Sequence, residues 1–116
     1  MNTQANPIMI DYQRSGGIRG LVDHLTISED GSAQLSRKAA RSEFTVAPSV
    51  LTEIREVLAG IDFSALKSKY EPDRPGADMY EYVITYGGHT VEAVETVLPP
   101  ELRPLVQLLD RIIDGA

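Results

Sequence analysis

The chain of 116 residues contains no cysteine, no tryptophan and only two histidines. Without cysteine it has no disulfide scaffold, no thiol nucleophile and no cysteine-ligated zinc or iron–sulfur cluster. No apolar run approaches the roughly 18 residues of a membrane-spanning helix, and residues 1–7 lack the basic and apolar segments of a signal peptide. We therefore expect a cytoplasmic protein in which residues 1–7 form a disordered tail.

Basic residues are also in the minority, since 11 lysines and arginines face 17 aspartates and glutamates for a net charge of −6. Proteins that bind nucleic acids present a basic face. The one basic cluster, Arg37, Lys38 and Arg41, is explained at least as well by a solvated loop. A hydrophobic content of 42% excludes a disordered chain, and the length suits one domain. We expect a single domain over residues 1–116 that binds neither nucleic acids nor membranes.

Alternation of apolar and polar residues predicts the strands. Two strands, over residues 8–13 and 21–27, are joined by a turn at Gly16–Gly17, although Asp23 breaks the apolar face of the second. A third strand begins near Ala33 after an Asp30–Gly31 turn and resumes over residues 43–46. Residues 80–86 and 89–95 form a hairpin around Gly87–Gly88. Its register pairs Tyr86 with His89, Ile84 with Val91 and Tyr82 with Ala93, on the core side.

The period changes to that of a helix in two places. Apolar residues from Val50 to Ile61 recur on one helical face, with Pro48 suited to the first turn and Gly60 to the C-terminal cap. The last helix begins near Pro104 and ends at Gly115. The predicted order is β-β-β-α-β-β-α. Hairpins imply an antiparallel sheet, and two amphipathic helices must cover one of its faces, which makes a two-layer α+β domain.

No catalytic motif stands out. Ser15 precedes two glycines but is not in a G-x-S-x-G nucleophile elbow, and Gly16, Gly17 and Gly20 fail both phosphate-loop patterns. His24 and His89 lack the convergent partners of a zinc site, so we expect no metal and no cofactor. The residues favour a binding or inhibitory module. A small enzyme using Asp78, His89 and a tyrosine stays open as an alternative, and so does a non-catalytic module that binds some other protein.

Several short motifs in one order resemble the emfourin family, small bacterial inhibitors of thermolysin-like zinc metallopeptidases such as protealysin. The shared residues are Arg14-Ser15-Gly16-Gly17 with Gly20, Phe63 and Leu66, Gly76-Ala77-Asp78 with Tyr80, Tyr82 and Ile84, His89-Thr90-Val91, and Leu102-Arg103-Pro104-Leu105. They cover most of residues 8–113. Here Ile18 stands where the family has an aromatic residue, and residues 28–46 form a longer segment.

The resemblance implies an inhibitor, not an enzyme, that blocks the peptidase cleft without chelating its zinc. It also implies a partner-binding surface at the glycine-rich turn, with a second part after the proline-rich loop. The candidate contact residues are Arg14, Ser15, Gly16, Gly17, Ile18, Arg19, Gly20, Asp78 and Tyr80. The side chain expected to enter the hydrophobic primed-side pocket of the enzyme is Ile18. For the inhibitor itself we expect a monomer or a weak homodimer.

Overall fold

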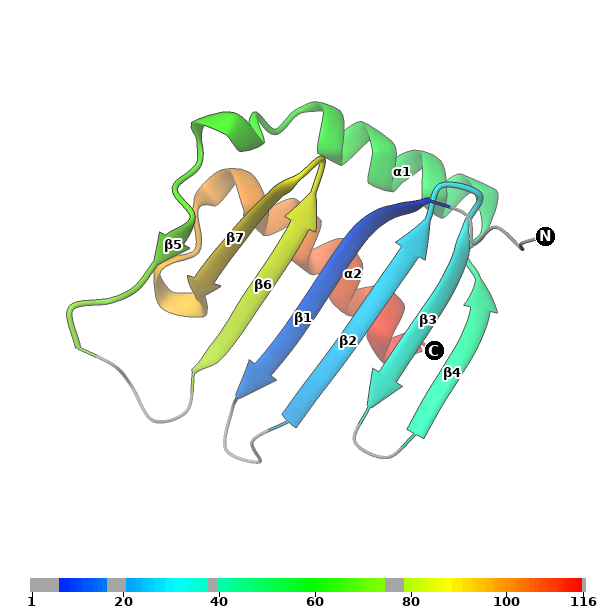
Figure 1. Cartoon of the computed structure of the whole chain (residues 1–116), viewed down its shortest axis with the longest axis horizontal. Helices are drawn as coiled ribbons and strands as arrows, with labels where there is room; N and C mark the ends of the chain where they lie inside the picture. Colours follow the sequence, from blue (N-terminus) through cyan, green and yellow to red (C-terminus); the bar gives the residue numbers. More distant parts are fainter. Residues whose placement is uncertain (1–6, 17–20, 38–39, 75–78, 116) are drawn as a thin grey trace.

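The computed structural model describes residues 7–16, 21–37, 40–74 and 79–115 (Figure 1). Its helices and longer strands, in chain order, are β1 (Ile8–Gly16), β2 (Leu21–Ser28), β3 (Ser32–Arg37), β4 (Ala40–Thr45), α1 (Pro48–Ala59), β6 (Tyr80–Tyr86), β7 (His89–Val94) and α2 (Arg103–Gly115). A two-residue strand, β5 (Lys69–Tyr70), and three short 3-10 turns lie between them. Of the predicted tail, residues 1–6 lie outside the described residues, whereas the carbonyl of Pro7 accepts a 3.0 Å hydrogen bond from the amide of Glu29.

The described strands form one seven-stranded sheet in the order β4-β3-β2-β1-β6-β7-β5. The predicted α+β class is confirmed, but the sheet is mixed, because β5 runs parallel to β7 while every other neighbouring pair is antiparallel. After α1 the chain passes through the 3-10 turn Phe63–Ala65 and reaches the far edge of the sheet. A strand of two residues is too short to show a period, so no pattern in the sequence indicated it.

The single third strand predicted after Ala33 is wrong, because the segment folds as the two strands β3 and β4. They pair from Ser32 with Thr45 to Arg37 with Ala40, and the connecting residues 38–39 lie outside the described residues. The strand β4 is the outermost of the sheet, and all its side chains except Phe44 are exposed. An exposed edge strand shows little alternation of apolar and polar residues, which explains why the sequence around the basic cluster did not indicate a hairpin.

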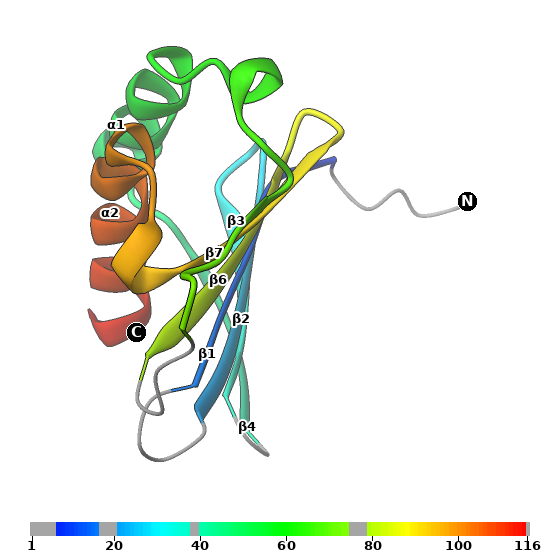
Figure 2. The same ribbon diagram turned by 90° about the vertical axis from the view of Figure 1, so that its left-hand side faces the viewer.

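Both helices cover the same face of the sheet (Figure 2), as the two-layer prediction requires. The helix α1 begins at Pro48 and is capped by Gly60, whose amide donates to the carbonyl of Val57 at 3.1 Å. The helix α2 follows a 3-10 turn at Pro100–Leu102, which accommodates Pro104 in the first helical turn. None of the helices in the described ranges is long and apolar enough to cross a membrane.

The β6–β7 hairpin has the predicted register, with Tyr86 opposite His89, Ile84 opposite Val91 and Tyr82 opposite Ala93. Gly87 and Gly88 have φ angles of 59° and 83°, the two positive values that a type I′ turn requires. The sheet face under the helices holds the core, and its largest fully buried side chains are those of Tyr12, Ile10, Leu25, Ile27, Leu35, Ile54, Ile84, Leu102, Leu105, Leu109 and Ile113.

Gly16 ends β1 at a φ of +103°, and a Cβ built there would lie 2.5 Å from the carbonyl oxygen of Met79. Replacing Gly16 with alanine therefore combines backbone strain with a clash, and we expect a loss of about 3 kcal/mol in the free energy of unfolding. Gly87→Ala is the matched control, because that glycine also has a positive φ but has nothing within 4 Å of the added Cβ. It should lose only about 1 kcal/mol. Equal losses in chemical denaturation would contradict the close approach.

Candidate functional site at one end of the sheet

The ends of β1 and β3 and the starts of β2, β4 and β6 lie at the same end of the sheet. Gly16 pairs with Leu21 on one side and with Tyr80 on the other, and Arg37 pairs with Ala40. Because Asp23 of β2 also pairs with Arg37, these strand ends share one end of the sheet (Figure 1). We call this the loop end, defined by Gly16, Leu21, Arg37, Ala40 and Tyr80.

The two candidate contact segments, residues 14–20 and 78–80, are far apart in the sequence, but each contributes one described residue to the loop end, Gly16 and Tyr80. Gly16 is the strand partner of Tyr80, and the guanidinium carbon of Arg14 lies 5.7 Å from the centre of the Tyr80 ring. The amide of Tyr80 donates a 2.8 Å hydrogen bond to the Glu95 carboxylate. Ser15, half-buried in β1, pairs with Val22 and Glu81. The remaining candidates, Gly17, Ile18, Arg19, Gly20 and Asp78, lie outside the described residues.

Arg14, expected at the contact surface, points instead to the helix side of the sheet and is only 8% exposed. Its Nε and Nη2 atoms donate to Oδ2 of Asp23 at 3.1 and 2.7 Å. Asp23, which the sequence pattern treated as a break in the apolar face, is 2% exposed and lies directly beside Arg14 in the neighbouring strand. A buried charge must be paired, and each of these two residues supplies the partner that the other needs.

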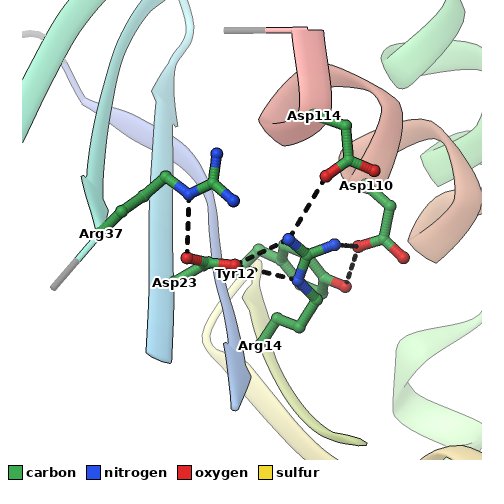
Figure 3. Close-up of polar contacts among 6 residues, drawn as sticks. All are labelled: Tyr12, Arg14, Asp23, Arg37, Asp110 and Asp114. Atoms are coloured by element: carbon green, nitrogen blue, oxygen red, sulfur yellow. Dashed lines mark hydrogen bonds and ion pairs between the residues drawn. The ribbon is translucent and has the colours of Figure 1, made fainter. Parts of the chain in front are cut away.

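Further carboxylates complete the pairing of Arg14 (Figure 3). From α2, Asp110 lies 3.2 Å from Nη1 and Asp114 lies 3.5 Å from Nη2. On the other side, Nε of Arg37 in β3 donates to Oδ1 of Asp23 at 3.1 Å. We call this set of five residues the Arg14 network. It joins three adjacent strands to the C-terminal helix just inside the loop end.

Tyr12 extends the network toward the core, because its hydroxyl donates a 2.7 Å hydrogen bond to Oδ1 of Asp110. Burial is the main cause that raises the pKa of Asp110, with a further rise from Asp114, and it outweighs the lowering by Tyr12 and Arg14. Burial disfavours the charge of Arg14 as well, but its hydrogen bond to Asp23 and the surrounding carboxylates raise its pKa overall. Arg14 is thus a permanent cation that holds structure together, and we assign it a positioning role rather than a partner contact.

The sequence analysis missed Asp23, Asp110 and Asp114 as partners of Arg14. One signal was present: Asp23 falls in phase with the buried Leu25 and Ile27, so its side chain had to face the core. Asp110 and Asp114 are four positions apart on the last helix and therefore share a face. Nothing in the sequence indicated that this face lies over Arg14, which is almost 100 positions earlier.

Of the residues of the alternative enzyme site, His89 is the strand partner of Tyr86 at the turn of the β6–β7 hairpin, far from Tyr80 at the other end of β6. His89 is exposed beside the Gly87–Gly88 turn, and the seven residues of β6 separate that turn from Tyr80 by about 20 Å. Asp78 lies outside the described residues. His24 contacts Asp11 on the neighbouring strand, at 2.9 Å. No three His, Asp or Glu side chains in the described ranges are grouped so that they could hold a metal ion.

No protein-family model and no curated protein matches this chain. The resemblance to the emfourin family therefore depends on the short motifs alone. Two of those motifs, at residues 14–17 and 76–80, contain Gly16 and Tyr80, which lie at the loop end.

Replacing Asp23 with alanine leaves the buried Arg14 without its closest carboxylate, and breaking such a buried pair costs about 3 kcal/mol. We expect that loss in the free energy of unfolding, measured by urea denaturation. Asp73→Ala removes an exposed carboxylate outside the network and should change stability by less than about 0.5 kcal/mol. A loss for Asp23→Ala as small as that of the control would show that the pair does not hold the sheet together.

The raised pKa of Asp110 predicts a pH dependence of stability. The folded chain holds this proton more tightly than the unfolded chain does, so the group's contribution is full below its ordinary pKa of 3.8 and declines as the pH rises through the raised value. Asp110→Asn cannot titrate. The free energy of unfolding of this variant, relative to that of the wild type, should therefore increase as the pH rises above 3.8. A relative stability that decreases over that range would mean that Arg14 lowers the pKa of Asp110.

Proposed function

We propose that the chain inhibits thermolysin-like zinc metallopeptidases by filling the active-site cleft with the loop end of its sheet. The observation that supports this most is that Gly16 and Tyr80, which come from the two separate candidate segments, are strand partners at one end of the sheet. A surface assembled from two segments offers the area and shape that blocking a cleft requires. The emfourin resemblance supplies the class of target, and a cytoplasmic location stays a prediction.

The proposed contact turn follows a strand whose end is firmly held. Arg14 is buried and paired close to the end of β1, and the last residue of that strand, Gly16, lies against the carbonyl of Met79. A turn that is fixed at its base loses less conformational entropy when it binds, which favours affinity. In this proposal Ile18 enters the apolar primed-side pocket, with Arg19, Asp78 and Tyr80 around it.

The proposed mechanism is occlusion, with the zinc left in the enzyme. A protein that removes zinc needs three or four convergent ligands of its own, and the ranges that the structure describes bring no such group together. An apolar side chain in the primed-side pocket instead blocks the position that a substrate side chain would occupy. The enzyme keeps its metal, and activity returns only when the inhibitor dissociates.

Titration of protealysin or thermolysin with the purified chain, after pre-incubation and with a quenched peptide substrate, tests the function. The proposal predicts a stoichiometric loss of activity that added zinc does not restore. Recovery on adding zinc would mean chelation, and no loss against several such peptidases would favour a binding module with another partner.

Ile18→Asp should weaken inhibition at least about tenfold, because an aspartate loses its hydration when it enters an apolar pocket. The inhibition constant is measured in the same substrate assay. Ile8→Asp is a matched control, since Ile8 is 59% exposed and lies at the opposite end of β1. The control should inhibit like the wild type. If both variants inhibit equally well and remain folded, the turn is not in the interface.

A further inference from the structure

The strand β4 ends the sheet on one side, and among the described strands it pairs only with β3. Its sequence, Ala40-Arg41-Ser42-Glu43-Phe44-Thr45, contains no proline and no glycine. An edge strand with free backbone groups is a template for pairing with another strand. The side chains of β4 decide which strand fits it.

The hydrogen-bond pattern shows which backbone groups of β4 are turned outward. The amide of Val46 donates to the carbonyl of Gly31 at 2.8 Å, and the register of β3 and β4 has no shift from there to Ala40. In an antiparallel pair, every second residue bonds to the neighbouring strand. Ala40, Ser42 and Phe44 therefore bond to β3, and the amides and carbonyls of Arg41, Glu43 and Thr45 face away from the sheet.

Two of these outward-facing residues carry opposite charges. Arg41 and Glu43 are both exposed, and their side chains lie on the sheet face opposite the helices. Side chains alternate between the two faces of a strand, and Ser42 and Phe44 lie on the helix side, because they pair with the buried Leu35 and Ala33. An antiparallel pairing with a second copy, centred on Ser42, puts Arg41 of each copy opposite Glu43 of the other. A pairing centred on Arg41 or on Glu43 would instead put like charges opposite each other, which is destabilising.

The side chains of β4 on the helix side of the sheet also fit the pairing centred on Ser42. Phe44 of one copy comes opposite Ala40 of the other, in a non-hydrogen-bonded pair whose side chains are close together. A large side chain thus meets a small one on each side of the twofold axis. A groove of about 300 Å³ opens beside this edge, so the helices leave space here; it is lined by Phe44, Thr45, Val46, Ala47, Val50, Glu53, Leu108, Arg111, Ile112 and Gly115.

We infer that β4 is a homodimer interface, in which two copies pair antiparallel about Ser42 and continue one sheet into the other. The occupant is a second copy because the charge pattern of β4 is complementary to itself, as a twofold interface requires. A strand of six residues buries less area than a standard protein interface, so the dimer is weak and depends on concentration. The loop ends of the two copies point in opposite directions about the twofold axis. The inference is argued from β4 alone and does not depend on the proposed function.

Sedimentation equilibrium over a range of concentrations tests the interface. The wild type should show a monomer–dimer equilibrium. Glu43→Arg and Arg41→Glu should each weaken dimerisation at least about tenfold, because both turn two attractive pairs into repulsive ones. An equimolar mixture of the two variants should recover dimers. In the mixed dimer, one copy carries only positive charge at positions 41 and 43 and the other copy carries only negative charge, so both cross-strand pairs are attractive again.

Glu56→Arg is the matched control, because it changes the net charge as Glu43→Arg does but lies exposed on α1 rather than on β4. It should dimerise like the wild type, and so should the double variant R41E/E43R, in which the charges are exchanged. Circular dichroism checks that each variant is folded. A wild type that stays monomeric at about 1 mM would overturn the inference. So would a dimer that is unaffected by the single variants, or a mixture that does not recover dimers.

Discussion

The buried ion pair between Arg14 and Asp23 is the constraint on which the rest of the structure depends. Two charges on the helix side of a sheet are tolerated only when they are paired and hydrogen-bonded. Their geometry fixes β1 against β2, the contact of Asp23 with Arg37 extends this to β3, and Asp110 and Asp114 bring α2 over the same place. At this end of an otherwise apolar core, each charged group therefore lies beside a group of the opposite charge.

The network lies directly inside the loop end, which links stability to the proposed function. Arg14 begins the candidate contact segment, residues 14–20, yet its side chain faces the helices rather than the solvent. Arg14 therefore stabilises the end of β1, and its guanidinium group also contacts the ring of Tyr80. The proposed peptidase contact uses the strand ends around Gly16 and Tyr80, and the proposed dimer contact uses the edge of β4, whose first residue, Ala40, also belongs to the loop end.

Periodic features were predictable and non-local ones were not. The register of the β6–β7 hairpin followed from Gly87–Gly88 and the tyrosine alternation, and α1 followed from its apolar face and its Pro48 and Gly60 boundaries. The parallel strand β5 and the split at residues 38–39 were missed, since one is too short and the other too exposed to show a period. Motif recurrence selected residues 14–20 and 78–80, but only the fold brings Gly16 beside Tyr80.

Amide hydrogen exchange of the chain, free and in the presence of an inactivated thermolysin-like peptidase, tests the central claim most directly. Binding through the loop end predicts new protection at residues 17–20 and 78–80, the candidate contact residues next to and including the strand partners Gly16 and Tyr80. The amides of β4 and α1 should exchange at the same rate in both samples. Protection confined to β4 or to the helices, or no protection at all, would contradict a peptidase contact at the loop end.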